Sequence, residues 1–411
     1  MPQEPAFPWH IGVFDAHCHP TDIMSSIPSL PRMKARCLTI MGTRAQDQDL
    51  VASVADEYGV KASSHHSEWS RQECMLPCFG WHPWFAHVMY LDSSDSEHER
   101  EGEAGGTGKT LTGEDKVAHY QKALAPSRQA PSEDDRKIYL SLPDPMSFSA
   151  FLTQMKLHLE KYPLALVGEI GLDRAFRIPE AWDPDAESSR QPELTRGGRE
   201  GRRLTPFRCA PAHQKEVFKR QLQLAAEMCR AVSVHGVQAH GLLFDAIKEL
   251  WTGHEKPILS KRERKKRGKD DPSITYPSQL EDSDQGGEMG KKPYPPRICL
   301  HSYSGTPDAF KQYLNPAIPV DMFASFSTTI NLGDAAGEET PESFVQMVKT
   351  VPDHMILIES DLHTAGDEMD RRLEDIVRRI CKIKGWGLEE GVERLGKNWR
   401  RFVFGKGMVP P

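Results

Sequence analysis

The sequence lacks the features that would direct the chain to a membrane or out of the cell. Of its 411 residues, 38% are hydrophobic, and no window offers the ~18 consecutive apolar residues that a membrane helix needs. The first ten residues contain neither the charged region nor the apolar region of a secretory signal. We therefore expect no membrane span and a cytoplasmic or nuclear location.

Paired cysteines and a strong charge of one sign are missing as well. The eight cysteines are scattered without a CxxC pair, and Cys74 and Cys78 are the closest two. This spacing argues for reduced thiols and against a disulfide framework. The net charge of -7 gives no general attraction to nucleic acid or to anionic membranes. It does not exclude a nuclease, because a metal site supplies its own positive field.

Three polar stretches interrupt an otherwise regular pattern. They are rich in acidic residues, Ser, Gly or Arg, and they span about 91–145, 175–212 and 252–296, the third with the basic run Lys261–Lys269. Such composition cannot bury enough apolar surface to offset the entropy lost on ordering, so we expect mobile surface insertions. About 270 residues remain, close to the size of one large α/β barrel. We therefore expect residues 1–411 to form a single domain.

The rest of the chain alternates between short apolar runs and helical stretches. Eight runs lack polar alternation, as buried parallel strands do: Ile11–Asp15, Arg36–Met41, Met75–Gly80, Ala165–Ile170, Ala231–His235, Arg297–His301, Met322–Ser327 and His354–Glu359. Helices are predicted at Gln46–Tyr58, His213–Cys229, Pro341–Val351, Glu368–Lys384 and Leu388–Phe404. Eight strand–helix alternations favour a (β/α)8 TIM barrel over an open doubly wound sheet.

Metal-ligand residue types gather at the ends of these runs. They are His17, His19, Glu169, His235, His301 and Asp361. Residues two apart in an extended segment share a face, so His17 and His19 can share one ion. A barrel collects its carboxyl strand ends around one opening. Each member alone has an ordinary structural explanation, because a single His usually makes a hydrogen bond and a carboxylate can cap a helix. Six ligands exceed what one zinc takes and suit two ions that share a carboxylate.

Five motifs carry a family resemblance. They are FDAHCH from Phe14, FGWHPW at Phe79–Trp84, VGEIGLD at Val167–Asp173, ICLHSYSG at Ile298–Gly305 and LIESD at Leu357–Asp361. In this order they resemble the TatD family of metal-dependent hydrolases and deoxyribonucleases, within the amidohydrolase-like barrels. The long insertions resemble the fungal branch of that family.

The resemblance implies a role for each candidate residue. One divalent ion is held by His17, His19 and Asp361, the second by His235 and His301, and Glu169 bridges them. Asp361 also orients the attacking water, so Asp361 and Glu169 are the expected catalytic residues. His82 contacts substrate phosphate, and Asp173 orients a ligand histidine. Family members hydrolyse DNA with zinc, manganese or magnesium bound.

Two departures from the family pattern concern the substrate. The family places an Arg two residues after the histidine of the fifth strand, where this chain has Val237, and a Pro after the aspartate, where this chain has Leu362. Hydrolysis is therefore better indicated than DNA as the substrate. The alternatives are a small ester, amide or phosphoester substrate, or an interaction protein on a retained barrel. The fungal branch is described as partnering a helical-repeat subunit of a cell-cycle ubiquitin ligase. The run Lys261–Lys269 is read either as a nuclear import signal or nucleic-acid contact, or as a solvated loop.

Overall fold

The central element is a sheet of eight parallel strands rolled into a nearly closed barrel. The computed structural model describes residues 5–92, 109–127, 130–182, 190–198, 201–258, 292–333 and 339–405. The strand order is β1-β2-β3-β7-β9-β10-β11-β12, and every neighbouring pair is parallel. The barrel strands are β1 (Phe14–Cys18), β2 (Cys37–Met41), β3 (Met75–Phe79), β7 (Leu166–Asp173), β9 (Val232–Val237), β10 (Arg297–Leu300), β11 (Asp321–Phe326) and β12 (Ile356–Ile358). The predicted (β/α)8 barrel is confirmed.

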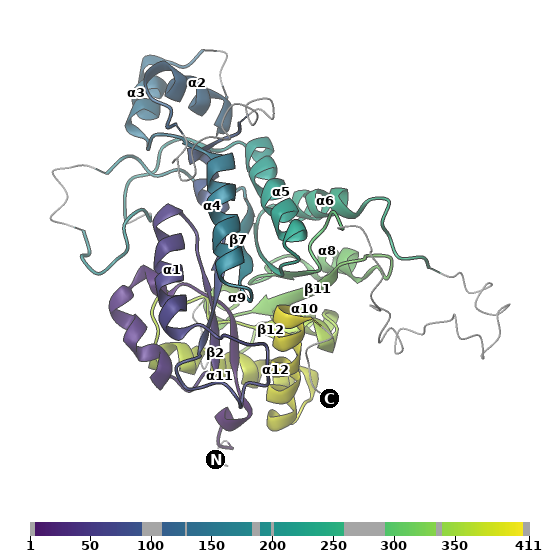
Figure 1. Cartoon of the computed structure of the whole chain (residues 1–411). Helices are drawn as coiled ribbons and strands as arrows, with labels where there is room; N and C mark the ends of the chain where they lie inside the picture. Colours follow the sequence, from purple (N-terminus) through teal and green to yellow (C-terminus); the bar gives the residue numbers. More distant parts are fainter. Residues whose placement is uncertain are drawn as a thin grey trace.

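Helices surround the barrel (Figure 1). The α-helices of the barrel are α1 (Ala45–Tyr58), α4 (Phe148–Lys161), α5 (Pro211–Glu227), α6 (His240–Trp251), α8 (Pro307–Lys311), α9 (Thr328–Asn331), α10 (Glu342–Thr350), α11 (Asp367–Lys384) and α12 (Leu388–Phe404). Short 3-10 helices are η1 (Trp9–Ile11), η2 (Pro20–Asp22), η3 (Met24–Arg32), η4 (Pro83–Val88), η7 (Gln312–Leu314) and η8 (Asp353–Met355). The five predicted helices are confirmed with ends within two residues. Among the described residues, no helix is long and apolar enough to cross a membrane.

The first strand begins three residues later than predicted, at Phe14 rather than Ile11. The reason is Gly12, which follows η1 with a φ of 100°. The chain turns there before it becomes extended, and the turn requires glycine, because a Cβ at Gly12 would lie 2.8 Å from Nε2 of His66. His17 consequently lies inside β1 rather than beyond its end.

One end of the barrel is packed and apolar. Trp399 and Phe402 of α12 belong to the same buried cluster as Phe14 and Leu357 of the strands. The rings of Phe14 and Trp399 stack with centroids 4.4 Å apart. Because α12 plugs this end, the polar strand ends face the opposite opening.

The first two insertions contain folded elements, which corrects our expectation of loops without a core. They form α2 (Gly113–Ala123), α3 (Glu133–Ser141) and β5 (Leu124–Ala125), which pairs antiparallel with β8 (Arg208–Cys209). β4 (Met89–Tyr90) pairs with β6 (Met146–Ser147) at their base. We call α2, α3, β5, β8 and their connecting residues the cap; Figure 1 shows α2 and α3 at one end of the molecule. Its apolar side chains form a separate cluster of Val117, Tyr120, Leu124, Tyr139, Leu142, Ile178 and Phe207.

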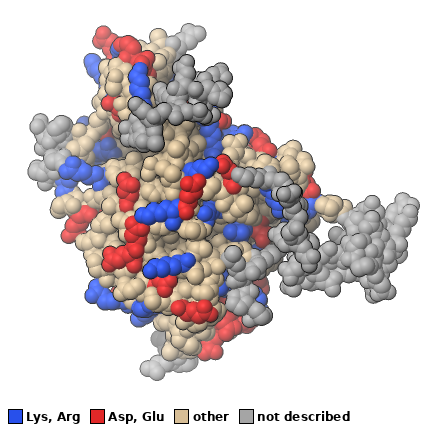
Figure 2. Space-filling view, in the orientation of Figure 1, with Lys and Arg blue, Asp and Glu red and all other residues tan. Residues whose placement is uncertain are grey.

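The acidic composition of these stretches concealed the helical spacing of their few apolar residues. The run Lys261–Lys269 and residues 259–291 of the third insertion lie outside the described part of the chain. Figure 2 shows basic and acidic side chains interspersed over the face drawn, in keeping with the absence of a strong charge of one sign.

Candidate metal centre

Glu169 on β7 lies at the centre of the predicted histidines and is 3% exposed. Its Oε2 is 3.4 Å from Nε2 of His17 and 3.4 Å from Nε2 of His19. Its Oε1 is 2.7 Å from Nδ1 of His235 and 3.0 Å from Nε2 of His301. The two carboxylate oxygens therefore face different histidines.

Asp361, just beyond the end of β12, lies next to His17 and His19. Its φ of 53° lies in the left-handed region, which Asp tolerates better than most residues. Its amide donates to the carbonyl of His17 (3.0 Å), and the amide of His19 donates to the carbonyl of Leu362 (2.8 Å). These bonds close the barrel between β1 and β12. Asp361 Oδ1 then lies 3.4 Å from Nε2 of His19 and 3.8 Å from Nε2 of His17.

The spacing of these donor atoms fits a divalent metal ion. Bonds of about 2.1 Å put the ligand atoms of a tetrahedral ion about 3.4 Å apart. The Nε2 atoms of His17 and His19 are 3.1 Å apart, and their distances to the two carboxylates are 3.4–3.8 Å. Imidazole nitrogen and carboxylate oxygen together suit zinc or manganese. Three buried groups have donor atoms within 4.8 Å of one another: His17–His19–Glu169, His82–Glu169–His235 and His17–His301–Glu359.

Glu359 orients His301 and was not assigned a role from the sequence. The carboxylate is fully buried and accepts hydrogen bonds from the hydroxyls of Ser302 and Ser325. Nδ1 of His301 lies 3.1 Å from Glu359 Oε1. Nε2 on the other side of the ring is 3.0 Å from Glu169 Oε1. Burial lowers the pKa of His301, but the nearby carboxylates raise it well above its usual range. The contact with Glu359 orients the ring so that Nε2, once its proton is displaced, can bind an ion at the centre. The sequence did offer a signal for Glu359, since the LIESD motif contains this acidic residue as well as Asp361.

Asp173 orients His235 in a similar way. Its Oδ2 is 3.2 Å from Nε2 of His235 and accepts the indole N–H of Trp84 at 2.6 Å. Burial raises the pKa of Asp173, but the hydrogen bonds from His235 and Trp84 outweigh it and lower the pKa to about 2. The ionised carboxylate accepts from Nε2 of His235, which leaves Nδ1 as the ring atom that faces Glu169.

His82 differs from the other histidines because its proton faces the centre. The backbone N–H of Trp84 donates to Nδ1 of His82 at 3.1 Å. Burial lowers the pKa of His82 to about 4, so the ring is neutral at neutral pH and carries its proton on Nε2. Nε2 lies 3.2 Å from Oε1 of Glu169. His82 therefore offers an N–H donor.

The carboxylates at the centre are ionised. Burial raises the pKa of Glu169, but His82, His301 and the other rings hold it well below its usual range. Burial lowers the pKa of His19, whereas its hydrogen bond to Asp361 and the nearby carboxylates raise it to about 9. Metal binding displaces such protons from ligand groups, and the ionised carboxylates that remain are suited to a cation.

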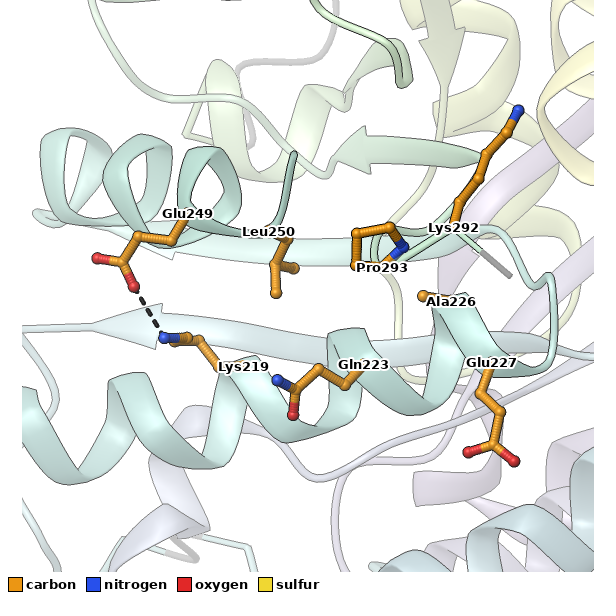
Figure 3. Close-up of a pocket in the computed structure, with 8 residues that line it drawn as sticks. All are labelled: Lys219, Gln223, Ala226, Glu227, Glu249, Leu250, Lys292 and Pro293. Carbon is orange, nitrogen blue, oxygen red and sulfur yellow. Dashed lines mark hydrogen bonds and ion pairs between the residues drawn. The ribbon is translucent and has the colours of Figure 1, made fainter. Parts of the chain in front are cut away.

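A pocket with a cavity volume of about 440 Å³ lies elsewhere, between α5 and α6. Lys219 of α5 and Glu249 of α6 form a 2.8 Å ion pair across it (Figure 3). Its remaining lining residues are Gln223, Ala226, Glu227, Leu250, Lys292 and Pro293. None of them belongs to the metal centre.

Comparison with known proteins decides the family. Residues 14–404 match the family of TatD related DNases. The chain belongs to the TatD family. This TatD chain is 34% identical over 392 residues to the Cut9-interacting protein scn1 of Schizosaccharomyces pombe, covering 95% of the chain and 98% of the relative. It is 27% identical over 285 residues to an uncharacterized deoxyribonuclease of Saccharomyces cerevisiae, covering 69% of the chain and 64% of the relative.

Two solved structures are similar to this TatD chain. A TatD homologue of Escherichia coli has a TM-score of 0.48 at 14% identity, covering 97% of this chain and 98% of the other. A TatD-family hydrolase of Entamoeba histolytica has a TM-score of 0.49 at 12% identity, and the match covers 96% of this chain and 99% of the other. The predicted family is confirmed by the family match. The chain is a TatD-family hydrolase whose buried His and Glu side chains can hold metal.

Proposed function

We propose that this chain hydrolyses phosphoester bonds of DNA with two divalent metal ions. The observation that carries the proposal is the position of Glu169, whose two oxygens face separate histidine pairs. This arrangement supports two ions that share one carboxylate. Zinc and manganese match the imidazole donors, and magnesium is the third candidate.

Each protein ligand has a defined place in this proposal. His17, His19 and Asp361 would hold one ion, His235 and His301 the other, and Glu169 would bridge them. When bound, two such ions lower the pKa of water and stabilise charge that develops at phosphorus. The neighbours Glu359 and Asp173 would hold the rings of His301 and His235 with one nitrogen turned toward the ion that it would bind.

The chain's own groups orient the reactants. Asp361 is ionised, because the hydrogen bond from His19 and the nearby histidines outweigh burial and lower its pKa to about 2. It can therefore accept a hydrogen bond from the attacking water and receive its proton. The Nε2–H of His82 is placed to donate to a phosphoryl oxygen of the substrate.

The first experiment is the metal content of the purified protein by elemental analysis. We expect about two ions per chain, fewer in His17→Ala/His19→Ala, and no hydrolysis of DNA by that variant or by Asp361→Asn. The control is His65→Ala, which removes an exposed histidine outside the centre. Absence of bound metal after addition of zinc or manganese, or activity retained in the double variant, would contradict the proposal.

A small substrate is the alternative within the same chemistry. Val237, two residues beyond His235, offers no cation for a phosphate chain. Turnover of small esters, amides or phosphoesters without any hydrolysis of DNA would select this alternative. The metal requirement and the Asp361→Asn result stay the same in both cases.

A protein partner is the second candidate function. The fission-yeast relative is named for its interaction with Cut9, and the chain covers 98% of that relative. By this similarity the chain would bind a helical-repeat subunit of a cell-cycle ubiquitin ligase in the cytoplasm or nucleus. The third insertion is the proposed contact. Deleting residues 261–290, which lie outside the described residues, should abolish binding to Cut9 in a pull-down and preserve hydrolysis; binding that survives excludes this contact.

A further inference from the structure

The second insertion returns to the opening of the barrel. Thr195 lies beyond β7 in the chain, yet its amide donates to the carbonyl of Asp22 (2.8 Å) and its hydroxyl to the carbonyl of Thr21 (2.7 Å). Thr21 and Asp22 follow His19 at the end of β1. We call Thr195–Gly197 the rim segment, because it lies against the loops that follow β1 and β2.

A buried arginine holds the rim segment in place. Arg44, at the end of β2, is 7% exposed. Its Nε donates to the carbonyl of Arg196 (3.1 Å) and its Nη2 to the carbonyl of Thr195 (3.3 Å). Asp22 (3.0 Å) and Asp47 (3.1 Å) neutralise its charge. A buried guanidinium is costly unless its donors are paired, so Arg44 depends on the two carbonyls of the rim segment.

Gly197 permits this close approach. Its φ is 99°, and a Cβ there would lie 2.7 Å from Nε2 of Gln46 and 3.1 Å from Nε of Arg44. Gln46 also donates to the carbonyl of Arg196 (3.1 Å). A larger residue at this position would both strain the backbone and push the segment away from the rim.

The rim segment is connected to the metal centre through Asp22. Asp22 Oδ2 lies 2.7 Å from Nδ1 of His363. The ring of His363 stacks on that of His19, with centroids 5.3 Å apart and an interplanar angle of 21°. Two contacts therefore join the backbone of Asp22, on which Thr195 docks, to a proposed metal ligand.

The side chain of Arg196 is exposed on this fixed backbone. A small phosphoester would be held at the metal centre alone, whereas a nucleic-acid chain carries further phosphates past the rim. A guanidinium binds a phosphate with two parallel hydrogen bonds and suits such a contact. We propose that the rim segment is a substrate-binding edge and that Arg196 binds a phosphate neighbouring the scissile one in a nucleic-acid chain. This rests on the proposed phosphoester hydrolysis, and it makes the second insertion a determinant of substrate specificity.

The test compares a single-stranded oligonucleotide with bis(p-nitrophenyl) phosphate as substrates of the metal-loaded full chain. In Arg196→Gln we expect the ratio of kcat/KM for the oligonucleotide to kcat/KM for the small diester to fall roughly tenfold. A plot of the logarithm of the binding constant for the oligonucleotide against the logarithm of the salt concentration should become shallower by about 0.7, because one phosphate contact is missing. Arg196→Lys should recover part of the loss, because it restores the charge without the paired geometry.

Two comparisons separate binding from a structural effect. Arg394→Gln on α12 is the matched control, since it removes an arginine at the plugged end of the barrel and should leave the ratio unchanged. Gly197→Val should displace the rim segment and lower the ratio as Arg196→Gln does. An unchanged ratio in Arg196→Gln, or an equal loss on both substrates, overturns the proposal.

The role of Arg196 can be tested apart from the proposed function by measuring oligonucleotide binding in a variant that is expected to be inactive. A fluorescent oligonucleotide should bind Asp361→Asn roughly tenfold more tightly than Asp361→Asn/Arg196→Gln. If the wild type hydrolyses neither substrate, the proposed function fails, and this binding comparison still decides the role of Arg196. Equal affinities overturn it.

Discussion

At the residue scale, the partner on the far side of each imidazole ring determines which nitrogen faces Glu169. His301 and His235 contact carboxylates on their outer side, so the other nitrogen of each ring faces Glu169 and can bind an ion once its proton is displaced. A backbone N–H donates to His82, so this ring turns an N–H inward. The same residue type therefore supplies both proposed metal ligands and a hydrogen-bond donor. The sequence located these histidines but did not distinguish them, because the deciding partners come from other strands and loops.

Glu359→Gln should weaken metal binding without touching a proposed ligand. The amide keeps the size of the side chain, but it can turn an N–H donor as well as an oxygen acceptor toward Nδ1 of His301, so it orients the ring less strictly. We expect metal affinity to fall roughly 10–100-fold, measured by competition with a chelator. Thermal unfolding of the metal-free protein is the control. Unchanged affinity would mean that Glu359 serves only to pack the barrel.

At the scale of elements, the cap packs on η4 and α5 through one buried and two half-buried histidines. His87 of η4 is 4% exposed, and its carbonyl accepts from Nε2 of His119 on α2 (2.8 Å). Nε2 of His213 on α5 donates to the carbonyl of Ala86 (3.0 Å). Burial lowers the pKa of His87 to about 3 and of His119 to about 4, with neighbouring histidines adding to the shift. Both rings are neutral in the folded state.

Acid should therefore loosen the cap. The unfolded chain binds protons at these rings near their ordinary pKa of 6.5, whereas the folded chain does not. The contribution of the neutral rings to the free energy of unfolding is complete above pH 6.5 and is lost as the pH falls toward about 4. Limited proteolysis of α2 and α3 at stepped pH measures this. His87→Phe, which removes the titration, should flatten the pH dependence; an equally acid-labile variant contradicts the explanation.

The cap also depends on its own small core. Phe207 joins insertion residues of α2 and α3 in one cluster and is 2% exposed. Phe207→Ala should destabilise the cap by about 3–5 kcal/mol, because it removes apolar contacts and leaves a cavity. Hydrogen exchange should accelerate in α2 and α3. The amides of β7 serve as the internal control, and equal acceleration there would show that the cap and barrel unfold as one unit.

At the scale of the whole molecule, the barrel brings strand ends from the full length of the chain to one opening. Metal bound there must stabilise the folded state, because the ligand set exists only when all the strands have assembled. At a metal concentration one hundred times the Kd, the gain is about 2.7 kcal/mol. Differential scanning calorimetry should show a rise in Tm for the wild type. His17→Ala/His19→Ala should show a much smaller rise, and an equal rise would place the metal elsewhere.

The pattern of the sequence was sufficient for the eight barrel strands and for five of the barrel helices, but α4, α6, α8 and α9 were not predicted. Buried parallel strands are uniformly apolar, and α12 matched its prediction at both ends. Periodicity failed where local backbone geometry or sparse apolar residues decided the outcome. Gly12 delayed β1, and the few apolar residues of α2 and α3 found partners in the second insertion.

The sequence by itself determined which residue types lie at the strand ends, and so the six residues proposed as ligands of the metal centre, but not the role of Glu359. The positions of His17, Glu169 and Asp361 follow from the barrel, since every strand delivers its carboxyl end to the same opening. Only the tertiary structure decided the hydrogen-bond partners of these residues and the return of Thr195–Gly197 to the rim. Those contacts join segments far apart in the chain, and no local pattern encodes which side chain a distant loop will meet.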